Sequence, residues 1–237
     1  MSKLSVSEAF VSIQGEGKSM GRRSVFLRLA GCNLMCGGQG TQFDKELHSG
    51  AEWRCDTIEV WMKGKAKAFD DILDKEMLDQ LIDGAHLIIT GGEPLLQQDA
   101  ICDFLESLDM PVFVEIETNG TIMPNTYLIE RVNQWNISPK LTSSGNGKLG
   151  INDDVLEMFN EWSPEKVQFK FVVANEKDID EIEELDLDPH KIWLMPAGST
   201  QAEIAYRAQE VVLWALEKAY SYSHRLQVSI WNQTTGV

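Results

Sequence analysis

Apolar residues recur along this chain in two alternating patterns. Short, nearly continuous apolar runs predict strands at residues 24–31, 86–92, 112–120, 135–140, 167–173, 191–198 and 225–231. Apolar residues at helical spacing predict helices at residues 70–83, 97–108, 152–162 and 176–185. A further helix begins at Thr200, where Glu203 completes a capping box, and extends to about Tyr220. This alternation predicts an α/β fold with a mostly parallel sheet, which we expect to form one open or partial barrel over residues 1–237.

Turn-prone polar motifs follow several of the predicted strands. Gly31 and Cys32 follow the first strand, and "TGGEP", "ETNGT", "SPK" and "MPAG" follow later ones. In parallel α/β folds the carboxyl ends of the strands share one side of the sheet, and ligands bind there. The sequence therefore predicts that these motifs line a single site.

Composition and charge narrow the classes of partner. The chain has 237 residues and a formal net charge of −16, which disfavours nonspecific binding to nucleic acid or to an anionic membrane. No apolar run approaches the ~20 residues of a membrane-spanning helix, and the N-terminus lacks the apolar core of a secretory signal. We therefore expect a cytoplasmic protein with no nucleic-acid or membrane partner. In that compartment, clustered cysteines suggest metal binding or catalysis.

Three of the four cysteines lie around one loop. Three residues separate Cys32 from Cys36, and Cys55 follows only after residues 37–54. Three thiolates suit a soft metal or an iron–sulfur cluster, and a [4Fe–4S] cluster held by three cysteines leaves one iron open to a further ligand. His48 in the intervening segment offers a fourth ligand. A structural zinc site with three cysteines and one histidine is therefore the alternative that the spacing leaves open.

The neighbouring motifs favour the cluster. In order along the chain, "SIQGEG", "FLRLAGCNLMC", "CDT", "ITGGEP", "ETNGT" and "ISPK" resemble radical S-adenosylmethionine enzymes and, more narrowly, the 7-carboxy-7-deazaguanine synthases. The resemblance runs from about Glu8 to Lys170 and returns at the C-terminus. It implies an open TIM-like βα barrel of the radical S-adenosylmethionine type. The usual motif has only two residues before its third cysteine, so residues 37–54 are interpreted as an insertion in the cluster-binding loop.

The resemblance also implies a reaction. A [4Fe–4S] cluster on Cys32, Cys36 and Cys55 passes an electron to S-adenosylmethionine, and the resulting radical removes a hydrogen atom from 6-carboxy-5,6,7,8-tetrahydropterin. The ring contracts with loss of ammonia to 7-carboxy-7-deazaguanine. The cofactor is regenerated, so the net reaction is that of a lyase in 7-deazapurine biosynthesis of the queuosine type. Mg²⁺, a flavodoxin or ferredoxin as electron donor, and a homodimer are implied by the same resemblance.

Site residues follow from the matching motifs. For S-adenosylmethionine, Glu93 is a carboxylate suited to its ammonium group, and Gly91 and Gly92 lack a Cβ that would obstruct a ligand. The remaining residues expected at the cofactor are Thr118, Asn119, Ser138 and Lys140. A turn that leads into a helix is the plain structural alternative for "GGEP", and a surface turn is the alternative for "SPK".

The expected pterin site draws on both ends of the chain. Gln14 and Glu16 offer an amide and a carboxylate to the pterin edge, and a wrong substrate would leave such buried groups unpaired. Arg28 suits a bidentate contact with the substrate carboxylate, unless it is a surface charge on a half-exposed strand. The resemblance adds Glu117 and the terminal Val237 as substrate contacts.

Two further positions complete the expected site. Thr57 resembles the residue that helps to bind Mg²⁺, and the alternative is that Thr57 or Asp56 caps a helix. The family's C-terminal strand usually carries a substrate-contacting histidine, but "RLQVSIWNQTTGV" has none. Trp231 or Ser229 is expected in its place.

Two other functions compete with the synthase. A radical S-adenosylmethionine activase, which makes a glycyl radical on a partner protein, would share the cluster and "GGEP" but would not need "SIQGEG". A structural-zinc α/β module would bind a nucleotide or a partner protein without redox chemistry. Iron and zinc content distinguishes the last possibility from the other two.

Overall fold

The computed structural model describes residues 3–237 and is built on one nine-stranded sheet in the order β3-β1-β2-β4-β5-β6-β7-β8-β9. The strands are β1 (Lys3–Ile13), β2 (Arg23–Leu29), β3 (Lys65–Ala68), β4 (His86–Gly91), β5 (Val114–Thr118), β6 (Gln134–Ile137), β7 (Val167–Val173), β8 (Ile192–Pro196) and β9 (Ser221–Tyr222). β1 runs antiparallel to β2 and β3, and every other pair is parallel. The sheet is open, because β3 and β9 form separate edges.

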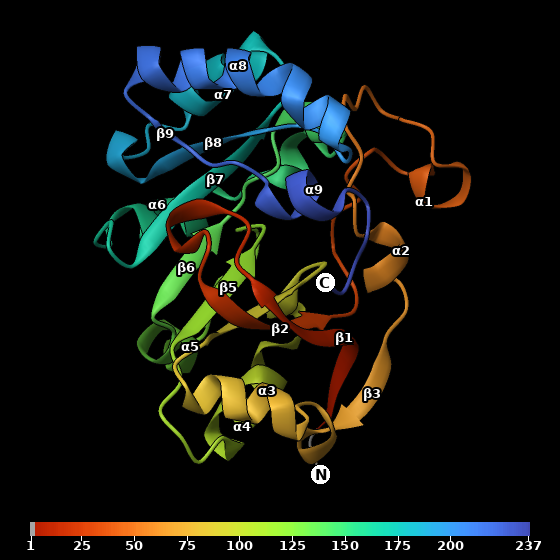
Figure 1. Ribbon diagram of the computed structural model, residues 1–237. Helices are drawn as coiled ribbons and strands as arrows, with labels where there is room; N and C mark the ends of the chain where they lie inside the picture. The colour runs from red at the N-terminus through yellow and green to blue at the C-terminus, as the bar shows by residue number, and fades with distance from the viewer. Residues whose placement is uncertain (1–2) are drawn as a thin grey trace.

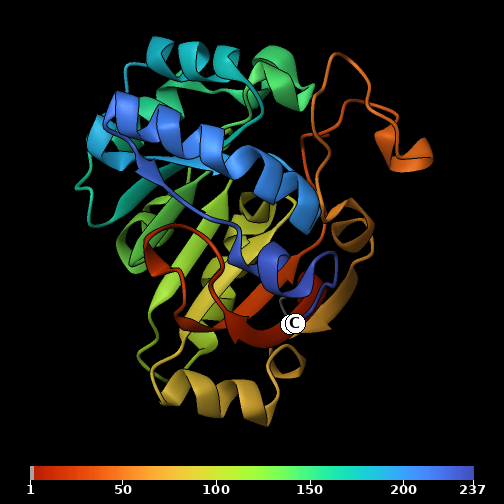
Figure 2. The ribbon, with the colours of Figure 1, turned by 45° about the horizontal axis from the view of Figure 1, so that its top comes forward.

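Helices lie between most successive strands and after the last one. They are α1 (Thr41–Asp44), α2 (Ile58–Trp61), α3 (Lys75–Ile82), α4 (Gln98–Ser107), α5 (Thr126–Arg131), α6 (Asp153–Asn160), α7 (Glu176–Glu184), α8 (Gln201–Lys218) and α9 (Leu226–Trp231). Figures 1 and 2 show α1 projecting from the body of the molecule, while α9 and the C-terminus lie beside β1. The N–H of Leu226, the first residue of α9, donates to the carbonyl of Gly15 just after β1 (3.0 Å). The two ends of the chain therefore meet.

Alternate residues of the central strands face different surroundings. Ile116, Trp135, Phe169 and Phe171 belong to the hydrophobic core, which also takes up buried residues of α3, α4, α6 and α7. Because successive side chains of a strand point to opposite faces, the intervening residues face the other side of the sheet. Those intervening positions are mostly polar and include Glu115, Glu117, Asn136, Gln168 and Lys170. One face of the sheet thus builds the core, and the other presents polar groups.

The structure confirms the predicted fold class and most of the predicted elements. The parallel strands from β2 to β8 match predicted apolar runs, and Thr200 and Glu203 form both hydrogen bonds of the capping box at the start of α8. The helix predicted at residues 70–83 is shorter. A 3-10 turn covers Phe69–Asp71, and α3 starts only after Asp74, whose side chain accepts a hydrogen bond from the N–H of Met77. An N-cap of this kind fixes the start of a helix more strongly than apolar spacing does.

The prediction of a last strand at residues 225–231 is wrong. The last strand is the two-residue β9, and Leu226–Trp231 form α9. A short run with alternating apolar residues fits either a strand or one helical face, and burial decides between them. Only Val228 of α9 is buried, and the side chains of Arg225 and Gln227 both hydrogen-bond to Glu16. These polar contacts with the end of β1 hold the segment on the polar side of the sheet.

The sequence analysis did not predict β1, β3, α1, α2, α5 or β9. The signal for β1 was present, because Leu4 and Val6 alternate with polar residues and are buried. The other missed elements are six residues or shorter, so they offer few positions for any periodic pattern. No helix in the described part of the chain combines the length and the apolar composition that crossing a bilayer requires.

Removing the capping hydroxyl should weaken α8 measurably. Thr200→Ala is expected to lower the free energy of unfolding by about 1 kcal/mol, because the N–H of Glu203 loses its side-chain acceptor. Denaturant unfolding of the full chain measures this change. Thr126→Ala, at an exposed position in the first turn of α5, is the control and should change stability by less than about 0.5 kcal/mol. Equal losses in both variants would contradict a capping role for Thr200.

Candidate active site

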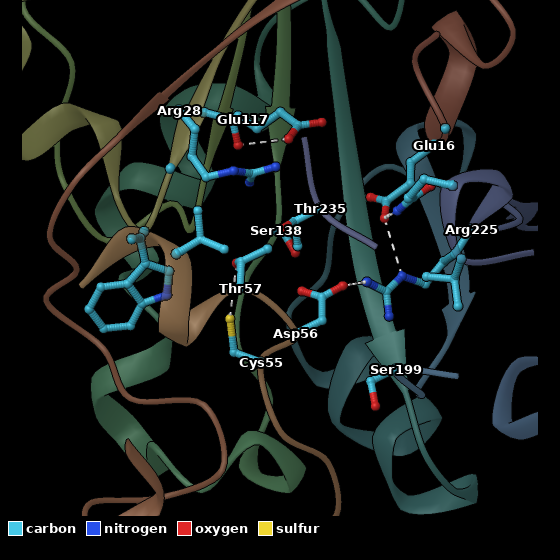
Figure 3. Close-up of a pocket in the computed structure, with 18 of the residues that line it drawn as sticks. Glu16, Arg28, Cys55, Asp56, Thr57, Glu117, Ser138, Ser199, Arg225 and Thr235 are labelled. Atoms are coloured by element: carbon cyan, nitrogen blue, oxygen red, sulfur yellow. Dashed lines mark hydrogen bonds and ion pairs between the residues drawn. The ribbon is translucent and has the colours of Figure 1, made fainter. Parts of the chain in front are cut away.

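A cavity of about 650 Å³ lies at the carboxyl ends of the parallel strands, against the C-terminal segment. The structure brings nearly all of the predicted site residues to its wall, namely Gln14, Glu16, Arg28, Cys32, Cys36, Cys55, Thr57, Gly91, Gly92, Glu117, Thr118, Asn119, Ser138, Lys140 and Val237. Glu93 is the predicted residue that is absent from this wall. Figure 3 shows labelled side chains from several elements converging on the cavity.

The three cysteines of the loop meet at one part of the wall. The N–H of Cys55 donates to the carbonyl of Cys36 (3.2 Å), so the chain returns to its starting point after residues 37–54. Burial raises the pKa of the Cys32 thiol to about 11 and that of Cys36 to about 12, and the neighbouring Cys55 contributes to both increases. The three thiols therefore lie within electrostatic range of one another, although Cys55 is distant in sequence.

This donor set fits an iron–sulfur cluster better than a single metal ion. Within residues 3–237, no three His, Cys, Asp or Glu side chains lie close enough together to bind one ion. A cluster does not need such proximity, because each cysteine binds a different iron. The ring of His48 instead contacts the carboxylate of Asp44 (2.9 Å), the last residue of α1. The zinc alternative thus lacks its four-ligand group among the described residues.

Close contacts with neighbouring backbone require glycine at positions 91 and 92. A Cβ on Gly91 would lie 2.3 Å from the carbonyl oxygen of Leu29, and a Cβ on Gly92 would lie 2.3 Å from that of Gly31 and 2.6 Å from the Cβ of Cys32. Any larger residue would collide with backbone here. These glycines therefore let the end of β4 pack directly against the start of the cysteine loop.

Glu93 stabilises the strand ends from behind the cavity wall. Its carboxylate is fully buried and accepts hydrogen bonds from the N–H of Asn119 (2.7 Å) and the hydroxyl of Thr118 (2.9 Å). It also accepts a bond from the N–H of Leu95 (3.0 Å). Burial raises the pKa of Glu93, and these hydrogen bonds oppose the rise. The observed contacts give Glu93 a structural role, and direct contact with the ammonium of S-adenosylmethionine stays a prediction.

Ser138 and Lys140 interact with each other at the end of β6. The ammonium of Lys140 donates to the hydroxyl (2.6 Å) and to the carbonyl (2.7 Å) of Ser138. Asn119, at the end of the neighbouring β5, donates from its amide to Asn33 in the cysteine loop (2.9 Å). The predicted cofactor residues are thus held by one another and by the loop between Cys32 and Cys36.

Charged residues link the predicted substrate site across the cavity. The ammonium of Lys170 donates to Glu16 (3.0 Å) and to Glu117 (3.2 Å), and its side chain is only 3% exposed. Glu117 also accepts from the amide of Gln14 (3.2 Å) and the hydroxyl of Thr90 (2.9 Å). Arg28 donates from Nε to Glu8 (2.8 Å), and it lines the cavity as predicted.

The ion pairs shift the ionisation of their members. Burial alone would raise the pKa of Glu16, but the charges of Lys170 and Arg225 outweigh burial and hold the pKa well below its usual range. Burial would likewise lower the pKa of Lys170, and the carboxylates of Glu117 and Glu16 raise it instead. Glu16 and Lys170 are therefore both charged at neutral pH.

Lys170 and Arg225 are site residues that the sequence analysis missed. Lys170 is the one charge in the apolar run "VQFKFVV", where a polar side chain needs a partner across the sheet. Arg225 is the first residue of the segment that was wrongly predicted to be a strand. Trp231 and Ser229, which were expected to replace the family's histidine, do not line the cavity. The hydroxyl of Ser229 contacts His224 instead (2.6 Å).

Residues 37–54, the predicted insertion, contribute to the cavity wall. Lys45, Trp53 and Arg54 line the cavity, and the base of the insertion is attached to a 3-10 turn at Thr142–Ser144. The attachment consists of two backbone hydrogen bonds, from Gly37 and Glu52 to the carbonyls in this turn (2.9 and 2.8 Å). Residues 37–54 therefore form part of the site in addition to the exposed α1.

Comparison with known proteins identifies the family. A family profile described as a 4Fe-4S single cluster domain matches residues 13–134. A 7-carboxy-7-deazaguanine synthase from Halobacterium salinarum is 32% identical over 97% of this chain and 91% of that protein. This chain belongs to the 7-carboxy-7-deazaguanine synthase family. A synthase from Pyrobaculum aerophilum is 28% identical over 99% of this chain and 97% of its own length.

The fold agrees with the synthase family as well. The crystal structure of QueE from Escherichia coli covers 94% of each chain with a TM-score of 0.60, and at 22% identity it supports the fold alone. Membership in the family confirms the predictions of a radical S-adenosylmethionine lyase, of an iron–sulfur cluster and of S-adenosylmethionine as cofactor. The activase and the zinc module are not favoured.

Loss of Lys170 should destabilise the synthase fold in a pH-dependent way. Lys170→Met leaves Glu117 and Glu16 without their shared cation, and we expect a loss of about 3 kcal/mol at pH 7. The low pKa of Glu16 means that its contribution is present above the usual carboxyl range and is lost as the pH falls through the folded pKa. The raised pKa of Lys170 means that its contribution is present below the usual lysine pKa and is lost as the pH rises through the folded pKa.

Urea unfolding of the cluster-free chain at two pH values tests this. The difference in stability between wild type and Lys170→Met should shrink between pH 7 and pH 4, because the unpaired carboxylates of the variant become protonated. Lys191→Met is the matched control, since Lys191 is equally buried and pairs with Asp188 (3.7 Å) away from the cavity. A difference that is constant with pH, or an equal pH dependence of the difference in Lys191→Met, would contradict the assignment.

Proposed function

We propose that this chain converts 6-carboxy-5,6,7,8-tetrahydropterin to 7-carboxy-7-deazaguanine and ammonia, with Cys32, Cys36 and Cys55 holding the [4Fe–4S] cluster. One observation supports this assignment most strongly. Three thiols from a stretched motif and two ion-paired carboxylates, Glu16 and Glu117, line the same cavity. When bound, the cluster and S-adenosylmethionine together supply a radical that removes a hydrogen atom from the pterin. The whole chain is taken as a single domain for this purpose.

The chain's own residues bind and orient the reactants. Lys170 pairs with both Glu16 and Glu117, and the carboxylate oxygens of these two residues serve as hydrogen-bond acceptors for the N–H groups of the pterin. Arg28 uses Nε for Glu8 and has its Nη groups available for the substrate carboxylate. Val237 closes the cavity from the C-terminal side. These contacts favour a flat, carboxylated heterocycle with several donors along one edge.

The cofactor residues lie at the other side of the same cavity. Ser138 and Lys140 offer a hydroxyl and an ammonium group for the carboxylate or ribose of S-adenosylmethionine. Gly91, Gly92, Thr118 and Asn119 provide the adjacent wall. We expect these residues to limit the access of water to a bound cofactor, which would protect a reactive intermediate from side reactions.

Thr57 is proposed as a protein ligand of Mg²⁺. Its side chain makes no capping hydrogen bond to α2, which argues against the capping alternative. The hydroxyl instead lines the cavity and lies 3.4 Å from the sulfur of Cys55 (Figure 3). Mg²⁺ keeps several waters, so one hydroxyl and a substrate carboxylate suffice. The homodimer, the flavodoxin or ferredoxin donor and the cytoplasmic location are proposed from the family resemblance.

Cluster binding should depend on three cysteines and not on the fourth. Cys32→Ala, Cys36→Ala and Cys55→Ala are each expected to abolish binding of the [4Fe–4S] cluster and product formation after anaerobic reconstitution with iron and sulfide. Cys102→Ala is the control, because Cys102 lies in α4 and hydrogen-bonds to Asn125. Iron content, the visible spectrum and chromatography of 7-carboxy-7-deazaguanine measure the outcome. A Cys55→Ala variant with a full complement of iron would refute the assignment of the stretched motif.

The hydroxyl of Thr57 should set the requirement for Mg²⁺. Thr57→Val is expected to raise the Mg²⁺ concentration for half-maximal activity by about tenfold or more, because a ligand oxygen is lost. Thr57→Ser keeps the hydroxyl and should behave as wild type. Initial rates at a series of Mg²⁺ concentrations give the comparison. Identical Mg²⁺ dependence in wild type and Thr57→Val would exclude this site.

A further inference from the structure

Arg225 connects three segments that are distant in sequence. It precedes α9, and its side chain is only 11% exposed at the cavity wall. Nε donates to Glu16 at the end of β1 (3.2 Å), Nη2 donates to Asp56 after Cys55 (2.5 Å), and Nη1 donates to the carbonyl of Gly198 after β8. Figure 3 shows the guanidinium reaching between Glu16 and Asp56.

The two carboxylates differ in how firmly they are held. Glu16 also accepts hydrogen bonds from Lys170 (3.0 Å) and Gln227 (2.7 Å), so its position does not depend on Arg225 alone. Asp56 is 32% exposed, and Arg225 is the partner that the structure shows for its carboxylate. The end of β1 is therefore held by several contacts, and the ion pair fixes the segment that follows Cys55 to it.

This connection matters because of where Asp56 lies. It stands directly between Cys55, the proposed third cluster ligand, and Thr57, the proposed Mg²⁺ ligand. Residues 37–54 separate Cys55 from the other two cysteines, and a long connection restricts the position of its end only weakly. The ion pair of Asp56 with Arg225, on the other side of Cys55, adds a side-chain restraint to the backbone hydrogen bond that joins Cys55 to Cys36.

We propose that Arg225 is a positioning residue, which holds the Cys55–Thr57 segment against the pterin-binding end of β1 and thereby couples cofactor cleavage to substrate conversion. The inference rests on the proposed function. A pterin that hydrogen-bonds to Glu16 shares this carboxylate with Arg225, so the cation at the substrate site also contacts the cluster-binding loop. Loss of the guanidinium leaves Cys55 and Thr57 in the chain, but it removes the contact that holds their segment against the end of β1.

The first test measures the restraint without relying on catalysis. Hydrogen–deuterium exchange of residues 53–58 is followed in the full chain before and after cluster reconstitution. Arg225→Gln and Asp56→Asn should each speed exchange in this segment by roughly tenfold. The exchange rate of the double variant should not exceed that of either single variant, because all three variants break the same ion pair. Arg207→Gln is the matched control, because Arg207 donates to the carbonyl of Ala197 and touches neither carboxylate.

The second test measures coupling. Because the synthase regenerates its cofactor, free 5′-deoxyadenosine reports cleavage that yields no product. The ratio of 5′-deoxyadenosine to 7-carboxy-7-deazaguanine should rise by roughly tenfold in Arg225→Gln and in Asp56→Asn, with no further rise in the double variant. Arg225→Lys keeps the charge but not the forked geometry, so it should restore part of the coupling. The Arg207→Gln ratio should equal that of wild type.

The outcomes separate this inference from the proposed function. Effects of Arg225→Gln and Asp56→Asn that multiply in the double variant, or an equal effect of Arg207→Gln, would overturn the inference. A wild-type chain that forms no 7-carboxy-7-deazaguanine would overturn the proposed function instead, while the exchange experiment would still decide whether Arg225 restrains the loop. If a variant at Arg225 fails to fold, Asp56→Asn alone tests the pair from its exposed side.

Discussion

The polar wall of the cavity depends on the ammonium of Lys170, which is buried between the carboxylates of Glu16 and Glu117. Glu16 and Glu117 approach the same cation to 3.0 and 3.2 Å, which brings two negative charges close together in a poorly solvated space. Without the cation, each carboxylate would favour protonation of the other. A protonated pair would offer fewer acceptors to the edge of the pterin in the proposed substrate site. Breaking such a buried group is costly, whereas its formation contributes little net stability, so its value lies in the chemistry of the site.

The sheet can accommodate these charges because one of its faces packs into the hydrophobic core and the other lines the cavity. The core-facing side chains of the central strands, such as Trp135 and Phe169, are fully buried in the hydrophobic core. That side supplies the apolar burial that stabilises the domain. The opposite face is then available for the polar residues of β5 and β7, and the strand ends deliver them to one cavity. The openness of the sheet leaves room for the C-terminal segment to complete the polar wall.

Local patterns were enough to predict the parallel strands from β2 to β8 and the longer helices, and the family resemblance added most of the residues that line the cavity. The motif "GGEP" and the cysteine loop follow predicted strands, and the parallel sheet places the ends of those strands on the same side. Lys170 and Arg225 could not be predicted in this way, because their partners lie 154 and 209 residues away and leave no periodic signal. The same reason explains the error at α9. Its alternating apolar residues resemble a strand, and the deciding contacts are with Glu16 at the other end of the chain.

The stretched cysteine motif is compatible with an ordinary cluster site for a geometric reason. Residues 37–54 close on themselves at their base, where His48 donates to the carbonyl of Gly37 (2.8 Å) and Cys55 donates to that of Cys36 (3.2 Å). A side chain at Gly38 would lie 2.3 Å from the carbonyl oxygen of His48, so a glycine is needed for this closure. Closing eighteen residues instead of the usual two costs only about 2 kcal/mol in loop entropy. The backbone bonds at the base and the ion pair of Asp56 with Arg225 can offset a cost of that size. An insertion at this point therefore adds Lys45, Trp53 and Arg54 to the cavity wall without separating Cys55 from its companions.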